Sequence, residues 1–190
     1  CMPLARYDTL MGLCRDAGCE VLMGLNGLIG RTPAPNTTAM WTGQWDSSNA
    51  QQLLDYTRRA GYSGILAGVE LGNEIDGAAG IAAKLPPGPY ARDFFRLREI
   101  LDDTWPEGER PLLIGPDSSG FSDSWWYPQF LGNMTELGFV PLDVVTWHLY
   151  LLCSGNSTAV PSEILNATVL NTLAAKCQLH HATLETYGRE

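Results

Sequence analysis

An amide and a carboxylate stand side by side at the end of an apolar segment in the sequence VELGNEID, residues 69–76. The segment has the composition of a buried strand and stops at Gly72, so Asn73 and Glu74 follow at its carboxyl end. A carboxylate beside a buried strand costs free energy unless it is solvated or paired. Glu74 is therefore either a solvated loop or capping residue, or part of a functional site.

The chemistry that suits this pair is general acid/base catalysis on a sugar. A partly buried carboxyl group can keep a proton near neutral pH and give it to a leaving oxygen. Glycosidases place a second carboxylate opposite the first, about 5 Å away for retention of configuration or roughly 6.5–9.5 Å for inversion. The amide of Asn73 would hydrogen-bond a sugar hydroxyl, most strongly in the transition state.

Four strand-then-helix units must position these residues. The expected strands are residues 20–26, 65–71, 111–115 and 142–147. The expected helices are residues 5–18, 48–60 capped by Asp46 or Ser47, 90–104, 123–137 with a break near Pro128, and 162–180. Residues 27–45 are expected to be a loop. The strands are continuous apolar runs rather than alternating ones, which predicts burial on both faces and a parallel α/β sheet.

Polar residues gather directly after each expected strand. They are Asn26 after the first, Asn73 and Glu74 after the second, Asp117 and Ser118 after the third, and His148 and Tyr150 after the fourth. In a (β/α)8 barrel these strand ends share one face, where such enzymes have their active sites. A doubly wound sheet also fits the alternation, but no glycine-rich nucleotide motif follows any strand. A full barrel needs about 250 residues, so we expect the 190-residue chain to be a fragment of a single catalytic domain.

Composition excludes several classes of function. The net charge of −9 argues against binding to nucleic acid, and the only adjacent basic residues, Arg58 and Arg59, lie on an expected helix, so no basic patch is predicted. The chain has no run of about 18 apolar residues, so no transmembrane segment is expected. No zinc-type cysteine spacing occurs, and no metal or cofactor is expected.

Four glycosylation sequons indicate a secreted glycoprotein, either extracellular or in a lysosomal or vacuolar compartment, with membrane association left open. The sequons begin at Asn36, Asn133, Asn156 and Asn166. In an oxidising compartment Cys153 could pair with Cys177, and Cys14 with Cys19, although buried free thiols are an equal alternative.

Five motifs in order resemble the heparanase family, retaining glycosidases that cleave β-glucuronides. The motifs are GLNGL (24–28), QWDSSNAQQLLDY (44–56), ELGNE (70–74), GPDSS (115–119) and VTWHLY (145–150). The resemblance covers about residues 10–175 and implies a (β/α)8 barrel accompanied by a β-sandwich. This chain would then supply the third to sixth strand-helix units, without the other barrel strands and the β-sandwich.

The resemblance also implies roles for individual residues. Glu74 would be the general acid/base and Asn73 its neighbouring substrate amide. His148 would line the sugar subsite, and Tyr150 would orient the nucleophile. Asn26 and Asp117 match family positions and are expected in the pocket wall or in structural roles.

This sequence departs from the family's pattern in two respects. The family's nucleophile is a glutamate ending the seventh strand, which would lie beyond Glu190, so the 190-residue chain alone is expected to be inactive. No Arg or Lys occurs in residues 120–130, so a weakly charged β-glucuronide, rather than sulfated heparan, is the expected carbohydrate substrate. Trp125, Trp126 and Tyr127 could form a sugar-stacking surface or a helix packing face.

Two other interpretations remain open from the sequence. One is a retaining barrel glycosidase of a different family, because Asn-Glu after the fourth strand is shared across the larger clan. The other is a secreted, non-catalytic carbohydrate-binding homologue. The intact Asn73 and Glu74 argue against the second, because binding alone does not need both.

Overall fold

The computed structural model describes residues 2–77, 81–119, 125–152 and 155–188. Strand and helix alternate along most of the chain. The elements in order are α1 (Leu4–Ala17), β1 (Val21–Leu25), β2 (Thr32–Pro33), β3 (Trp41–Thr42), α2 (Ser48–Arg59), β4 (Leu66–Leu71), α3 (Pro87–Thr104), β5 (Leu112–Ser118), α4 (Trp126–Glu136), β6 (Val144–Trp147), α5 (Val160–Ile164) and α6 (Ala167–Glu185).

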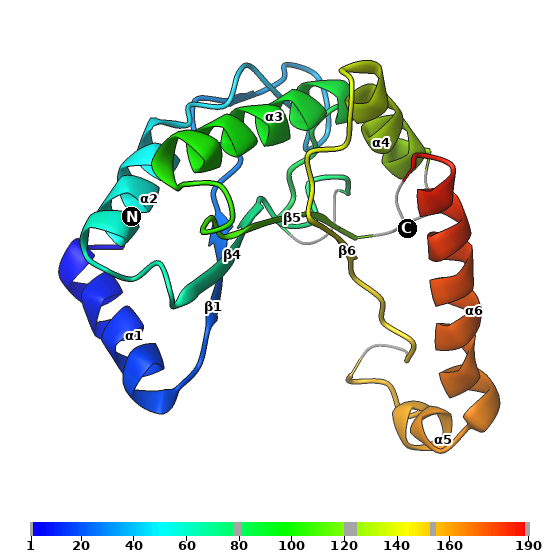
Figure 1. Cartoon of the computed structure of the whole chain (residues 1–190). Coiled ribbons are helices and arrows are strands. Elements are labelled where there is room, and N and C mark those ends of the chain that lie inside the picture. The colour runs from blue at the N-terminus through cyan, green and yellow to red at the C-terminus, as the bar shows by residue number, and fades with distance from the viewer. Residues whose placement is uncertain (1, 78–80, 120–124, 153–154, 189–190) are drawn as a thin grey trace.

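One parallel sheet with strand order β1-β4-β5-β6 forms the centre of the molecule. Figure 1 shows the strands lying inside an arc of helices, with α2, α3 and α4 along the outside of the arc and α6 at its C-terminal end. Each strand pairs with the strand of the next unit. The chain is therefore α/β with a parallel sheet, an arrangement consistent with part of a (β/α)8 barrel.

Local sequence explains where the helices begin and end. Gly18, with φ of 68°, ends α1, and the amide of Cys19 donates to the carbonyl of Cys14 at 2.9 Å, as in a Schellman motif. The Asp46 carboxylate accepts from the Ser48 amide at 3.0 Å at the start of α2. The Asn166 side chain caps α6 by accepting from the Thr168 amide at 3.0 Å.

The two faces of the sheet differ in burial. Val69, Leu71 and Leu113 are fully buried on the face that packs against the helices. The register places Leu22, Gly68 and Leu112 in one row on the opposite, inner face, where both leucines are exposed. The prediction that all strands are buried on both faces is therefore wrong for the inner face, where Leu22 of β1, Leu112 of β5 and Val144 of β6 are exposed, because nothing in the described chain covers these positions.

Aromatic side chains join α3 to α4 behind the sheet. Tyr90 and Phe94 contact each other edge to face with ring centroids 5.1 Å apart, and Trp126 stacks on Phe130 at 5.2 Å. All four rings are buried. Such contacts add to the apolar burial that fixes both helices against β4 and β5.

Three predicted elements are corrected by the structure. The expected loop of residues 27–45 contains the short antiparallel pair β2 and β3. Pro128 does not break α4, because it lies in the first turn, where a helix needs no amide donor. The expected helix of residues 162–180 is two helices, since Asn166 begins a new one. Within the described residues, no helix is both long and apolar enough to cross a membrane.

Candidate active site

The chain turns sharply where β4 ends. Gly72 has φ of 76° and would place a Cβ 2.2 Å from Ile75 Cδ1 and 2.8 Å from the Tyr90 hydroxyl, so only glycine fits there. The Tyr90 hydroxyl donates to the Leu71 carbonyl just before this turn. Glu74 also has a positive φ, of 49°, which a long side chain rarely adopts. Strained backbone of this kind is concentrated at functional sites.

Glu74 lies against the end of β6. Its Oε1 is 2.6 Å from His148 Nδ1, and the other ring nitrogen, Nε2, is 2.7 Å from Asp117 Oδ1. The side chains of Glu74 and Asp117 are 13% and 15% exposed, and that of His148 is 28% exposed. Three consecutive strands of the sheet thus each place one ionisable side chain in a Glu74–His148–Asp117 cluster.

Backbone contacts hold this cluster in place. The Glu74 amide donates to the Asp117 carbonyl at 2.8 Å, and the His148 amide donates to the Ser118 carbonyl at 2.7 Å. The Asp117 amide donates to Thr146 Oγ1 at 3.1 Å. Asp117 has φ of 55°, a conformation that Asp tolerates better than most residues. The turns that follow β4, β5 and β6 are therefore bonded directly to one another.

The carboxylates of Glu74 and Asp117 raise the pKa of the His148 imidazole. Burial lowers the pKa of His148, but its hydrogen bonds and its attraction to Glu74 and Asp117 outweigh burial and raise the pKa above the ordinary value. Because each ring nitrogen faces a carboxylate oxygen, the protonated ring donates from both nitrogens. In its protonated form His148 bridges the two acids.

Two further acids surround the cluster, and the sequence interpretation missed both. Glu70 lies on the inner face of β4, and burial first, then the negative charge of Asp117, raises its pKa, while His148 lowers it. The Asp76 carboxylate accepts from the Ser119 amide at 2.8 Å and from its hydroxyl at 2.9 Å. The signal for Glu70 was a lone acid inside an apolar strand.

The two asparagines predicted to bind substrate line one cavity. It has a volume of about 270 Å³ at the carboxyl ends of β1 and β4, and its wall includes Asn26, Gly27, Gly72 and Asn73. The Asn26 side chain accepts from the Leu28 amide at 2.9 Å, and the Trp45 indole donates to the Asn26 carbonyl at 3.0 Å. Trp45 is buried and packs the loop.

Tyr150 belongs neither to the Glu74–His148–Asp117 cluster nor to the wall of this cavity. Its side chain is 84% exposed beyond the end of β6. Of the two alternatives for Trp125, Trp126 and Tyr127, burial supports the packing face for Trp126 and Tyr127, whereas Trp125 is exposed. Trp147 contacts His180 edge to face at 4.2 Å, as a packing residue would.

The sequons occupy different environments. Asn36, Asn156 and Asn166 are exposed, whereas Asn133 lies within α4 and packs against Gly88.

Cys14, Cys19 and Cys177 are free thiols, and Cys153 lies outside the described residues. In the part of the chain that the structure describes, no three His, Cys, Asp or Glu side chains are grouped to hold a metal ion.

A parallel α/β sheet with an acid, an amide and a histidine at its strand ends is consistent with part of a barrel glycosidase. Comparison with known families narrows this class. The profile described as Glycosyl hydrolase family 79, N-terminal domain, matches residues 1–190. The chain belongs to this family, which sets aside the alternative of a different retaining glycosidase family.

Three curated relatives illustrate the similarity. Heparanase-like protein 1 of Arabidopsis thaliana is 30% identical over 99% of this chain and 33% of its own length. Baicalin-beta-D-glucuronidase of Scutellaria baicalensis is 32% identical over 88% of this chain and 32% of its own length. Heparanase of Mus musculus is 30% identical over 90% of this chain and 29% of its own length. The chain thus spans about a third of the length of these relatives.

Proposed function

We propose that this chain carries the acid/base half of a glycosidase active site that hydrolyses β-glucuronides with retention. The observation that carries the proposal is the hydrogen-bonded Glu74–His148–Asp117 cluster at the carboxyl ends of three adjacent strands. Family membership supports it, as do relatives named as a β-D-glucuronidase and as heparanases.

Glu74 is the proton donor and acceptor in this proposal. His148 Nδ1 holds Oε1 of Glu74 at 2.6 Å, which leaves Oε2 for the reacting oxygen. Oε2 gives its proton to the glycosidic oxygen as the bond breaks, and later takes a proton from the attacking water. Asp117 holds the far side of the ring and acts as a positioning residue.

The cavity beside the cluster is the proposed sugar site. Asn26 and Asn73 supply amide groups that hydrogen-bond sugar hydroxyls, and the glycines of the wall let the ring approach the backbone. His148 and Tyr150 remain proposed substrate contacts on the opposite strand end. The substrate is a glucuronide-containing carbohydrate.

The nucleophile belongs outside residues 1–190 in this proposal. Retention needs a second carboxylate about 5 Å from Glu74, across the sugar from it. The 190-residue chain by itself is therefore expected to be inactive, while the natural protein containing the nucleophile is active. Turnover of an aryl β-glucuronide by the 190-residue chain alone would overturn this assignment.

The deciding experiment compares Glu74→Gln with Glu109→Gln in the natural protein. Glu109 is an exposed acid between α3 and β5, so its substitution controls for the loss of one charge. Glu74→Gln is expected to lower kcat/KM for an unactivated alkyl glucuronide by at least about 100-fold. The loss should be smaller in the bond-breaking step of a nitrophenyl glucuronide, whose leaving group needs no proton. Equal activity of the two variants would reject Glu74, and a wild type that binds but never turns over glucuronides would favour the non-catalytic homologue.

A further inference from the structure

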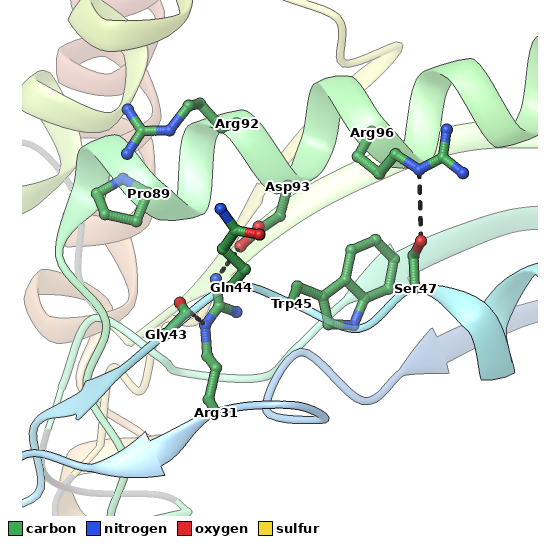
Figure 2. A pocket seen from close by; sticks show the side chains of 9 residues that line it. All are labelled: Arg31, Gly43, Gln44, Trp45, Ser47, Pro89, Arg92, Asp93 and Arg96. Carbon is green, nitrogen blue, oxygen red and sulfur yellow. Dashed lines mark hydrogen bonds and ion pairs between the residues drawn. The ribbon is translucent and has the colours of Figure 1, made fainter.

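A second cavity lies away from the Glu74–His148–Asp117 cluster. It has a volume of about 470 Å³ and separates the loop between β1 and α2 from the first turns of α3. Figure 2 shows Asp93 pointing from α3 toward the loop that carries Gln44 and Trp45, with Arg92 and Arg96 on either side of it along the helix. We call this cavity the arginine pocket; Arg31 and Ser47 complete its polar wall.

The two most buried charged side chains of the arginine pocket, Arg31 and Asp93, pair with each other. Arg31 and Asp93 form an ion pair at 2.6 Å with side chains only 1% and 11% exposed. Arg31 also donates to the carbonyls of Gly43 at 3.2 Å and Gly27 at 2.5 Å. Burial raises the pKa of Asp93 to about 6 against the lowering effect of Arg31, so the carboxylate is charged at neutral pH. This pair fixes the loop to α3 and leaves little of Arg31 for a ligand.

Of the other two arginines, Arg92 lacks a partner for its charge in the described part of the chain, and Arg96 has one at the surface. Among the residues that the structure describes, Arg92 makes no hydrogen bond or ion pair. Arg96 pairs with Glu99 at 3.1 Å at the surface and makes longer hydrogen bonds to Ser47 at 3.4 Å and Gln51 at 3.5 Å. Like charges four residues apart on a helix repel each other. An anion in the pocket would relieve this repulsion.

The uncharged wall has the character of a saccharide site. Trp45 and Pro89 supply apolar surface, and Gln44 and Ser47 supply hydrogen-bonding groups. In Figure 2 Arg92 and Arg96 lie at opposite ends of the pocket, with Gln44 and Trp45 between them. A few polar groups around an apolar floor are typical of small-molecule sites, and guanidinium groups suit carboxylates and sulfates. The prediction of no basic patch rested on adjacent basic residues, whereas Arg92 and Arg96 stand four residues apart on α3.

We infer that the arginine pocket is a binding site for an acidic saccharide unit, with Arg92 pairing with its carboxylate or sulfate and Arg96, at the other end of the pocket, facing its hydroxyl groups. It provides a local positive site in a chain of net charge −9. The inference rests on the proposed function only for the choice of a glucuronide as ligand. None of the residues that line the pocket belongs to the catalytic cluster, so binding here needs no turnover.

The test measures binding to the natural protein through the indole N–H signal of Trp45 in a two-dimensional NMR spectrum, assigned with Trp45→Phe. The probes are methyl β-D-glucuronide, methyl β-D-glucoside and inorganic sulfate. Arg92→Gln/Arg96→Gln is compared with Arg15→Gln/Arg59→Gln, which removes the same charge from arginines on α1 and α2 that do not line the pocket. Circular dichroism and Tm establish that both variants fold.

The glucuronide is expected to shift the Trp45 signal, and the pocket variant should bind it about tenfold more weakly, as loss of charge-assisted bonds predicts. The control variant should stay within about twofold, and the uncharged glucoside should bind at least about tenfold more weakly than the glucuronide. An unchanged Trp45 signal, or equal loss in both variants, would overturn the inference. Sulfate binding as tightly as the glucuronide would reject a saccharide site in favour of a simple anion site. A protein that hydrolyses no glucuronide can still pass this test.

Discussion

At the residue scale, the central fact is that one imidazole lies between two carboxylates. His148 touches Glu74 through Nδ1 and Asp117 through Nε2, both within 2.7 Å. Asp117 thereby influences the proposed proton donor without touching it through its side chain. The role of Asp117 can be separated from that of Glu74 because Asp117 changes the pKa of the His148 ring.

Asp117→Asn is expected to lower the pKa of His148, because one of the two carboxylates that raise it is removed. Asn tolerates the positive φ of this position, so the backbone should not change. The pKa is read from the histidine ring signals in an NMR titration, and kcat/KM is measured across the same pH range. A purely structural role for Asp117 would leave the His148 titration unmoved.

The same ion pairs make stability depend on pH. The pKa of His148 is raised in the folded state, so the pairs contribute fully below the unfolded value of about 6.5, and the contribution is lost as pH rises through the folded value. Urea unfolding of the wild type should therefore show stability falling over that window. The fall should be smaller in Asp117→Asn, and an equal fall in both proteins would contradict the assignment.

At the element scale, the turn after β4 decides where Asn73 and Glu74 lie. Gly72 and Gly61 have the same φ of 76°, but a Cβ at Gly72 would collide with Ile75 and Tyr90, while a Cβ at Gly61 meets nothing within 4 Å. Substitution of Gly61 by alanine therefore measures the cost of the backbone conformation alone. Substitution of Gly72 measures that cost together with the cost of steric crowding.

Gly61→Ala is expected to cost about 1 kcal/mol for the left-handed backbone alone. Gly72→Ala should cost about 2–4 kcal/mol, because forcing a methyl group into a packed site adds to that strain. Denaturant unfolding of both variants gives the comparison. Equal destabilisation would show that Ile75 and Tyr90 relax at no cost.

At the scale of the whole molecule, the chain is an arc with a well-packed outside and an apolar inside. Buried aromatic residues of α3 and α4, among them Tyr90 and Phe130, pack behind the sheet, whereas Leu22, Leu112 and Val144 are exposed on the inner face. An inner face of this composition is typical of a barrel interior, which side chains from all strands fill. Most of α6 is exposed as well, and only His180 of this helix is buried.

The exposure of each sequon predicts whether its asparagine carries a glycan. Glycans are expected on Asn36, Asn156 and Asn166, which are exposed, when the protein is produced in a secretory pathway. Asn133 should remain bare, because its Nδ2, the atom that carries a glycan, donates to the Gln129 carbonyl at 2.6 Å and the side chain packs on Gly88. Glycopeptide mass spectrometry of the secreted protein measures each site. Occupancy at Asn133 would show that the sugar is added before α4 packs.

The sequence by itself determined the alternation of strands and helices, because continuous apolar runs and helical periodicity are local signals. It also made Glu74, Asn73, His148 and Asn26 candidate site residues, since polar residues directly after strands stand out against apolar neighbours. Family resemblance added their expected roles. Pro128 and Asn166 were misread at helix boundaries because the first turn of a helix tolerates proline, and a capping asparagine resembles an interior residue in a polar segment.

Only the tertiary structure decided which of these groups touch. Asp117 was expected in the pocket wall, and its bond to His148 depends on the register of β5 and β6 and on the positive φ of its own backbone. The arginine pocket joins side chains from the loop after β1 and from α3, which no local pattern relates. Contacts of this kind depend on distances between separate elements, and those distances are fixed by packing of the folded chain rather than by neighbouring residues in the sequence.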